Sequence, residues 1–115
     1  MQRGEVWLIN LDPTIGVEIR KIRPAVIVND DAIGILPLKV IVPITDWKDH
    51  YALAPWMVCL EINKENGLNK TSAADAFQVR SVAQERFVKQ LGRLNNVTMK
   101  KIKSALAIVL CIDER

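Results

Sequence analysis

Apolar residues in this chain occur in short runs, some alternating with polar residues and some continuous, which is typical of β-strands. Turn-forming residues such as Asp, Pro, Gly and Asn separate these runs. The pattern predicts six strands, at residues 5–11, 25–28, 38–44, 55–62, 70–80 and 87–94. Asn66-Gly67, ahead of the fifth strand, is a strong hairpin signal, and residues 81–84 form a short connection with room for one helical turn.

The spacing of apolar residues changes near the end of the chain. Ile102, Ala105, Leu106 and Val109 follow the i, i+3, i+4, i+7 spacing of one helical face. Asn95-Asn96 supplies the N-cap of this helix. The sequence therefore predicts a mainly β (α+β) fold, a small and strongly curved antiparallel β-sheet or barrel with a C-terminal α-helix. Because there is no repeat, linker or low-complexity tract, residues 1–115 are expected to form a single domain.

Composition narrows the class of protein. Half of the 115 residues are hydrophobic, which is enough for one core, and the net charge of +3 favours a polyanion such as nucleic acid as partner. No apolar run is long enough to cross a bilayer, and no apolar signal segment follows the N-terminus, so we expect a cytoplasmic protein. Cys59 and Cys111 are expected to be buried core thiols. No cluster of ligands has metal spacing, so we expect neither metal nor cofactor.

Two polar side chains stand at predicted strand ends. Arg23 follows a cationic loop and precedes Pro24, which favours extended backbone at Arg23. Thr45 comes two residues after Pro43, which lacks an amide hydrogen and predicts the end or an edge of the third strand. A strand end gives a side chain a fixed origin, and the adjoining loop gives it access to a ligand. The alternatives are an ion pair of Arg23 with Glu18, and a local hydroxyl-to-backbone bond for Thr45.

Other polar and aromatic residues extend this set. Gln78 and Arg80 lie two apart in the predicted fifth strand, so they are expected to share one face. His50, the single histidine, lies in a polar loop without a fixed partner and is not expected to be catalytic. Trp47 and Trp56 flank that loop, and either could stack on a base or cover the core edge.

Taken together, these side chains suit phosphodiester chemistry. Arginine binds phosphate through a planar fork, threonine is a short donor and acceptor, and glutamine can read a base edge. None of them is a strong general base alone, so the set suits chemistry whose nucleophile is already in the substrate. RNA carries such a nucleophile in its 2′-OH, and positioning with charge stabilisation can supply much of the rate.

Over nearly its full length the chain resembles the MazF/PemK (also called Kid) endoribonuclease toxins of bacterial toxin–antitoxin systems. The matching stretches are residues 3–8, 11–13, 16–18, 23–28, 43–45, 75–81, 85–86 and 91–94. The resemblance implies an SH3-like barrel of the CcdB/MazF type. It further implies that Arg23 and Thr45 are the catalytic pair and that Glu18 and Gln78, with Arg80, contact RNA.

The chain departs from the family in two places. Asp46 stands where the family often has Ser, and an acid beside a scissile phosphate would repel it. Residues 47–55 match no family pattern, so the sequence leaves the cleavage motif open.

The function that the resemblance implies is metal-independent, sequence-specific cleavage of single-stranded mRNA. The 2′-OH would attack in line and leave a 2′,3′-cyclic phosphate and a 5′-OH, with Arg23 stabilising charge and serving in proton transfer. A homodimer would bind RNA at the subunit junction, and an acidic, disordered antitoxin segment would compete for a groove whose cations are Arg20, Lys21 and Arg23. The alternatives are a non-enzymatic toxin of the same fold that poisons DNA gyrase, and an RNA-binding module that leaves RNA intact.

Overall fold

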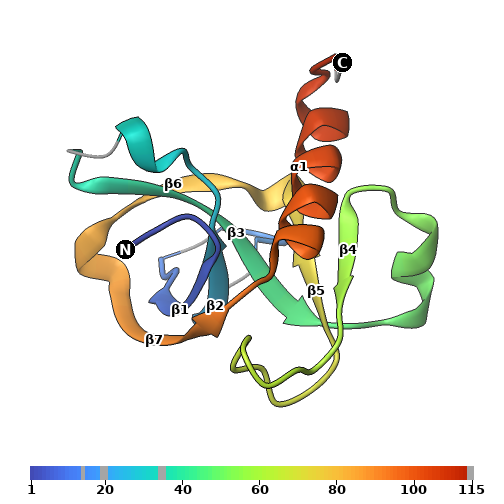
Figure 1. The fold of residues 1–115 in the computed structure, drawn as a ribbon, viewed down its shortest axis with the longest axis horizontal. Coiled ribbons are helices and arrows are strands. Elements are labelled where there is room, and N and C mark those ends of the chain that lie inside the picture. Colours follow the sequence, from blue (N-terminus) through green and yellow to red (C-terminus); the bar gives the residue numbers. More distant parts are fainter. Residues whose placement is uncertain (14, 19–20, 34–35, 114–115) are drawn as a thin grey trace.

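The computed structural model describes residues 1–13, 15–18, 21–33 and 36–113 (Figure 1). Its strands are β1 (Glu5–Asn10), β2 (Ile22–Ile27), β3 (Leu38–Asp46), β4 (Met57–Leu60), β5 (Ser72–Asp75), β6 (Arg80–Ala83) and β7 (Phe87–Arg93). Short 3₁₀ turns lie between them: η1 (Asp31–Ile33), η2 (Asp49–Leu53), η3 (Ala76–Gln78) and η4 (Gln84–Arg86). The chain closes with one helix, α1 (Asn96–Leu110).

The strands form one antiparallel sheet in the order β4-β5-β3-β2-β1-β7, with β6 paired to β3. The sheet curls strongly around its own interior without closing, as the ribbon of Figure 1 shows. The predicted mainly β fold with a C-terminal helix is therefore confirmed. Among the described residues no helix is both long and apolar enough to pass through a membrane.

Strands β1, β2 and β3 are buried on both faces, which divides the core in two. One cluster packs beneath α1 and includes Val6, Val26 and Val42. The other fills the inside of the curl and consists of Ile9, Leu11, Ala25, Ile27, Ile41 and Val82, and we call it the inner cluster. Alternation along a strand decides which cluster a side chain joins. A side chain at the end of a strand therefore lies on the same face as the residue two positions before or after it.

Helix α1 forms as its apolar spacing predicts. Asn95 is the N-cap, and its side chain accepts a hydrogen bond from the Thr98 amide at 2.8 Å. Ile102 and Ala105 are buried against the sheet, and Cys111 ends the helix in the left-handed conformation. This conformation satisfies the last carbonyls of the helix, because the Cys111 amide donates to Ala107 and Ile108.

The third and fifth strands differ from prediction. Strand β3 continues past Pro43 to Asp46. Its pairing with β2 ends at this proline, and its pairing with β5, on the opposite edge, begins at Ile44. The predicted strand at 70–80 corresponds to β5 and η3 and reaches only the first residue of β6, while the predicted connection at 81–84 is mostly β6, with η4 after it. The sequence hides this break, because Ala74 and Ala76 fit a strand pattern as well as a turn.

The turn at Asn66-Gly67 lies within an 11-residue connection between β4 and β5, longer than a tight hairpin. Gly67 has a φ of +70°, and a Cβ added there would stand 2.0 Å from the carbonyl oxygen of Leu91. The residue must be glycine because this connection packs directly against β7.

Both cysteines are exposed, and the prediction of two core thiols is wrong. Cys59 lies on the outward face of a four-residue edge strand, where only Val58 and Leu60 point inward. Partial desolvation raises the pKa of the Cys59 thiol above its usual value, and the neighbouring Glu61 carboxylate raises it further.

Candidate active site

Arg23 lies near the start of β2, where the chain leaves the loop and enters the sheet. Its backbone is opposite Ile9 of β1, and its side chain is half-buried. Because Arg23, Ala25 and Ile27 alternate with the residues that face α1, Arg23 continues the face of the inner cluster. The guanidinium therefore stands at the open end of that cluster.

Thr45 lies near the end of β3, where it is paired with Ala73 of β5. On the other edge of β3, the last pair with β2 joins Pro43 to Ala25, so Arg23 and Thr45 each lie two residues beyond that pair. Thr45 shares the face of Pro43 and Ile41, so its half-buried side chain continues the face of the inner cluster. The two strand ends that the sequence predicted therefore lie at the same end of the β2–β3 ladder.

Asp46 takes the other face. Its carboxylate accepts a hydrogen bond from Lys70, with 3.0 Å between the oxygen and Nζ, and both side chains are exposed. Strand alternation therefore turns the acidic group away from the face that holds Thr45.

A pocket of about 420 Å³ opens at this end of the sheet. Its lining consists of Leu11, Glu18, Pro43, Phe77, Gln78, Val79 and Arg80. Pro43 precedes Thr45 by two residues, and Arg80 is paired with Ile41 across the sheet. The pocket thus adjoins the face that carries Arg23 and Thr45, although neither side chain is part of its lining.

The loop between β1 and β2 borders the pocket with Glu18. Its carboxylate accepts a hydrogen bond from the Ile15 amide at 2.6 Å, so the acid organises its own loop and forms no ion pair with Arg23 among the described contacts. Lys21 is exposed and has a φ of +68°, and its amide donates to the Asp12 carboxylate at 2.8 Å. Arg20, predicted as a third cation here, lies outside the described residues.

Gln78 and Arg80 line the same pocket, although they do not lie on one strand as the sequence predicted. Gln78 belongs to turn η3 and Arg80 begins β6, so no single strand presents both. Asp75 caps the turn by accepting from the Phe77 amide at 3.1 Å. An Asp that binds the amide two residues on is an Asx-turn, and this signal in the sequence could have located the break.

Two residues that sequence reasoning did not select also shape the site. Phe77 is 63% exposed at the pocket, with its ring edge-on to Trp56 at 5.7 Å between centroids. Arg86 donates to the carbonyl oxygens of Asn10 at 3.0 Å and Asp12 at 2.5 Å. Arg86 therefore ties η4 to the base of the loop that carries Glu18.

The remaining candidates lie elsewhere. His50 is exposed and contacts the ring of Tyr51, at 4.7 Å between centroids, and Trp47 contacts the same tyrosine at 5.8 Å. Trp56 is half-buried against the core, as one of its two predicted roles requires. The part of the chain that the structure describes holds no group of three His, Cys, Asp or Glu side chains able to bind a metal ion.

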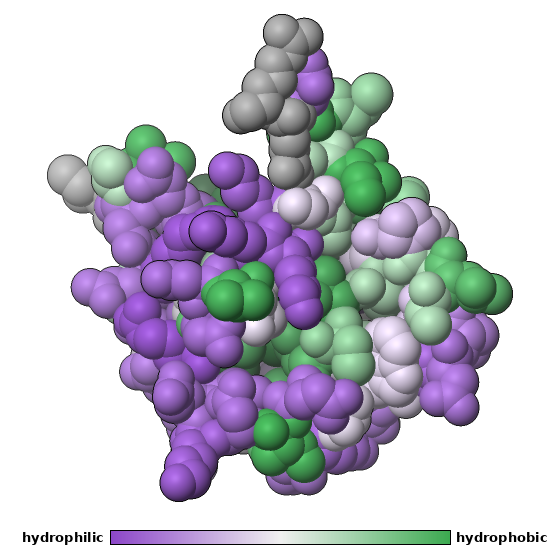
Figure 2. All heavy atoms as spheres, turned by 45° about the vertical axis from the view of Figure 1, so that its right-hand side comes forward, coloured by the Kyte–Doolittle hydropathy of each residue, from purple (hydrophilic) through white to green (hydrophobic). Residues whose placement is uncertain are grey.

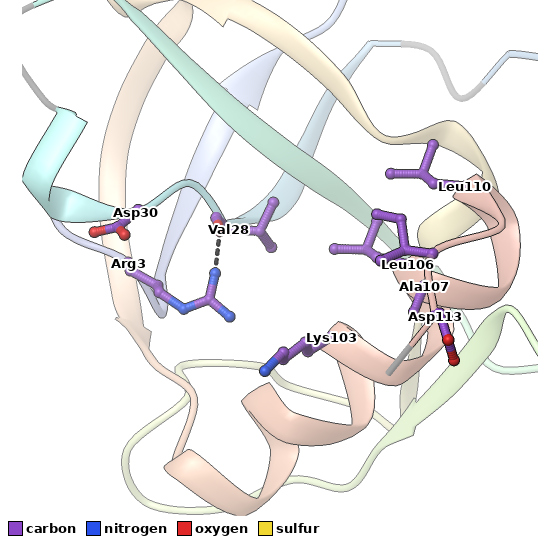
Figure 3. A pocket seen from close by; sticks show the side chains of 9 residues that line it. Arg3, Val28, Asp30, Lys103, Leu106, Ala107, Leu110 and Asp113 are labelled. Atoms are coloured by element: carbon purple, nitrogen blue, oxygen red, sulfur yellow. Dashed lines mark hydrogen bonds between the residues drawn. The ribbon is translucent and has the colours of Figure 1, made fainter. Parts of the chain in front are cut away.

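A larger hollow lies elsewhere on the molecule. A pocket of about 840 Å³ lies between α1 and the N-terminal segment, and Figure 3 shows Arg3 and Lys103 reaching into it from those two elements. A third hollow, of about 450 Å³, separates β4 from α1. In Figure 2, apolar side chains gather in the centre and right of the view, while the left part is mainly hydrophilic.

Comparison with known proteins agrees with the fold and extends over nearly the whole chain. Residues 2–110 match the family described as the PemK-like, MazF-like toxin of type II toxin–antitoxin systems. Endoribonuclease MazF9 of Mycobacterium tuberculosis is 32% identical over 116 residues, covering 96% of each chain.

Two solved structures share the fold. MazF of Deinococcus radiodurans superposes with a TM-score of 0.80 at 23% identity, over 96% of each chain. An endoribonuclease from a mycobacterial species, solved with its cognate antitoxin, gives a TM-score of 0.79 at 22% identity, covering 100% of this chain and 99% of that one. By sequence and fold alike, the chain belongs to the PemK-like, MazF-like toxins of type II toxin–antitoxin systems.

Proposed function

We propose that the protein is a sequence-specific endoribonuclease toxin that cleaves single-stranded mRNA without a metal ion. Its curated relatives are endoribonucleases. The observation that carries the proposal is that the last β2–β3 pair, Ala25 with Pro43, lies two residues from both Arg23 and Thr45, which supports the two side chains acting on one phosphate. Both side chains have rigid strand backbones, as electrostatic stabilisation of a transition state requires.

In the proposed reaction the substrate supplies its own nucleophile. The 2′-oxygen attacks the adjacent phosphorus and loses its proton, while the bond from phosphorus to the 5′-oxygen breaks and that oxygen gains a proton. The products are a 2′,3′-cyclic phosphate and a 5′-OH. The Arg23 guanidinium stabilises the negative charge that develops on the phosphoryl oxygens, and the Thr45 hydroxyl donates a hydrogen bond to one of them.

The pocket beside this pair would hold a base next to the scissile phosphate. Gln78 and Glu18 offer hydrogen-bonding groups to a base edge, and Arg80 and Lys21 offer charge to the RNA backbone. The exposed ring of Phe77 can stack on a base, which is the usual way proteins hold unpaired bases. The substrate is expected to be single-stranded because a paired base could not enter the pocket.

The expected partners are a second copy of the chain and a cognate antitoxin. The mycobacterial neighbour was solved with its antitoxin, which supports an antitoxin for this chain. An acidic antitoxin segment would compete with RNA for Lys21 and Arg23. Since mRNA is the substrate, the expected compartment is the cytoplasm.

Incubating the pure protein with a long RNA in EDTA tests the function. Discrete fragments ending in cyclic phosphate are expected, and His50→Ala should give the same fragments because His50 lies away from the pocket. RNA that is bound but intact, fragments that disappear with the chelator, or inhibition of gyrase without cleavage would each overturn the proposal.

A further inference from the structure

Asp75 is a buried acid beside the pocket that the proposed reaction does not use. It ends β5 and is 5% exposed. Burial raises the pKa of its carboxyl, and hydrogen bonds from Phe77 and Gln78 act in the opposite direction. A carboxylate in such a place needs partners, because a buried charge without them is strongly unfavourable.

The partners of Asp75 are divided between its two oxygens. Oδ1 accepts from the Phe77 amide at 3.1 Å, and Oδ2 accepts from Nε2 of the Gln78 side chain at 3.1 Å. The first contact fixes turn η3, and the second reaches a side chain that lines the pocket. One buried carboxylate therefore holds both the backbone and the functional group of the pocket wall.

The second contact determines which way the Gln78 amide is turned. An ionised carboxylate can only accept hydrogen bonds, so it selects the amino end of the amide and excludes the carbonyl end. The Gln78 carbonyl oxygen is consequently turned away from Asp75.

We propose that Asp75 is a positioning residue that fixes the Gln78 amide and thereby sets the base preference of the pocket. With the carbonyl oxygen turned to the base at the position of N6 in adenine or N4 in cytosine, the pocket favours these amino groups. It disfavours guanine O6 and uracil O4, which are acceptors at the same position. This inference rests on the proposed function, since it assumes that RNA enters this pocket.

The test exchanges donors and acceptors in the buried pair. Asp75→Asn places an amide nitrogen opposite Gln78 if the asparagine oxygen stays on the Phe77 amide, and Gln78 then turns its carbonyl inward and its amino group to the base. In the double variant Asp75→Asn, Gln78→Glu, the glutamate accepts from the asparagine and again presents an acceptor to the base. Asp113→Asn makes the same chemical change away from the pocket and is the control.

Cleavage sites in a random RNA pool would be mapped by sequencing for all four proteins. At one motif position, the ratio of kcat/KM for amino over carbonyl bases should fall about tenfold in Asp75→Asn, the size of one lost base contact. The ratio should return in the double variant even if its added negative charge lowers the overall rate. A merely structural role for Asp75 would lower all rates together and leave the ratio unchanged.

Each outcome decides between the two proposals. A wild-type protein that cleaves no RNA overturns the proposed function and this inference with it. A wild-type protein that cleaves, with an unchanged motif in Asp75→Asn, overturns this inference alone. If Asp75→Asn does not fold, Gln78→Met decides the point, because removing the amide from a half-buried turn should abolish the base preference at the same position. A retained preference in Gln78→Met contradicts the inference.

Discussion

Two hollows of this molecule differ in size and in chemistry. The pocket beneath α1 has about twice the volume of the pocket at the end of the inner cluster, about 840 against 420 Å³. In the larger one, Arg3 already donates to the carbonyl oxygen of Val28, and the Lys103 side chain comes from the exposed face of a helix. In the smaller one, Arg80 comes from the start of a strand, Gln78 from a capped turn and Glu18 from a loop.

The size of a pocket does not indicate where chemistry can occur, whereas polar groups on rigid backbone do. A transition state is stabilised by groups that need not reorganise. Arg23 and Thr45 meet this condition because each backbone belongs to a paired strand, Arg23 opposite Ile9 and Thr45 opposite Ala73. Lys103 does not, because a long side chain on a helix surface has many conformations available.

The largest expected effect distinguishes the strand ends beside the smaller pocket from the larger pocket. Arg23→Ala should reduce cleavage by roughly 10²–10³-fold, because it removes a charge-stabilising donor. Lys103→Ala removes the same charge from the larger pocket and should leave cleavage near wild type. Initial rates on one RNA, with circular dichroism to establish folding, make the comparison. Equal losses of cleavage rate in Arg23→Ala and Lys103→Ala would contradict a special role for Arg23.

Substitution with lysine refines this prediction. Arg23→Lys keeps the charge but loses the planar fork that binds two phosphoryl oxygens, so its rate should lie between those of wild type and Arg23→Ala. A fully active lysine variant would show that charge alone is sufficient at this position.

Thr45 is expected to contribute less than Arg23, because a hydroxyl is a neutral donor. Thr45→Ala should lower kcat by about 10-fold, the effect of one lost hydrogen bond in the transition state, and Thr45→Ser should retain most of the rate. Single-turnover rates at saturating protein would measure the chemical step. Full activity in Thr45→Ala would show that Thr45 has no part in the chemical step, which would leave Arg23 alone in that role.

Phe77 should affect binding more than chemistry. A base stacked on an aromatic ring gains about 1–3 kcal/mol, so Phe77→Ala should raise KM by roughly 10-fold with little change in kcat. Phe77→Tyr keeps the ring and serves as the control. A change confined to kcat would instead place this ring among the groups that act on the transition state.

The smallest effect is expected at Asp46. Its ion pair with Lys70 is exposed on both sides, and exposed pairs contribute about 0–1 kcal/mol. Because the carboxylate faces away from Thr45, Asp46→Ser should change the cleavage rate by less than about 3-fold, within the effect of a distant surface charge. Steady-state rates at two salt concentrations would measure it, and a large gain in rate would mean that Asp46 repels the substrate phosphate.

The sequence was sufficient to predict those features that depend on local patterns. Apolar runs located most of the strands, but Pro43 does not end the third strand, since Thr45 is still paired with Ala73. The sequence could not predict which distant residues lie opposite Arg23 and Thr45, because register is fixed by contacts between distant segments. It missed the role of Asp75 because the alanines on both sides fit a strand as well as a turn, so the capping acid was read as part of one long strand. The predicted burial of Cys59 is wrong for a related reason. Apolar neighbours in sequence do not determine which face of an edge strand is covered by other elements.

The central claim is that the RNA supplies the nucleophile and that the site of Arg23 and Thr45 stabilises its attack. The most direct test uses one oligonucleotide in two forms, all-ribose and with a single 2′-deoxy nucleotide on the 5′ side of the cleaved bond. Mass spectrometry should find a 2′,3′-cyclic phosphate and a 5′-OH from the ribose form and no cleavage of the deoxy form at that bond. Cleavage of the deoxy form, or fragments with a 5′-phosphate from the ribose form, would contradict the account.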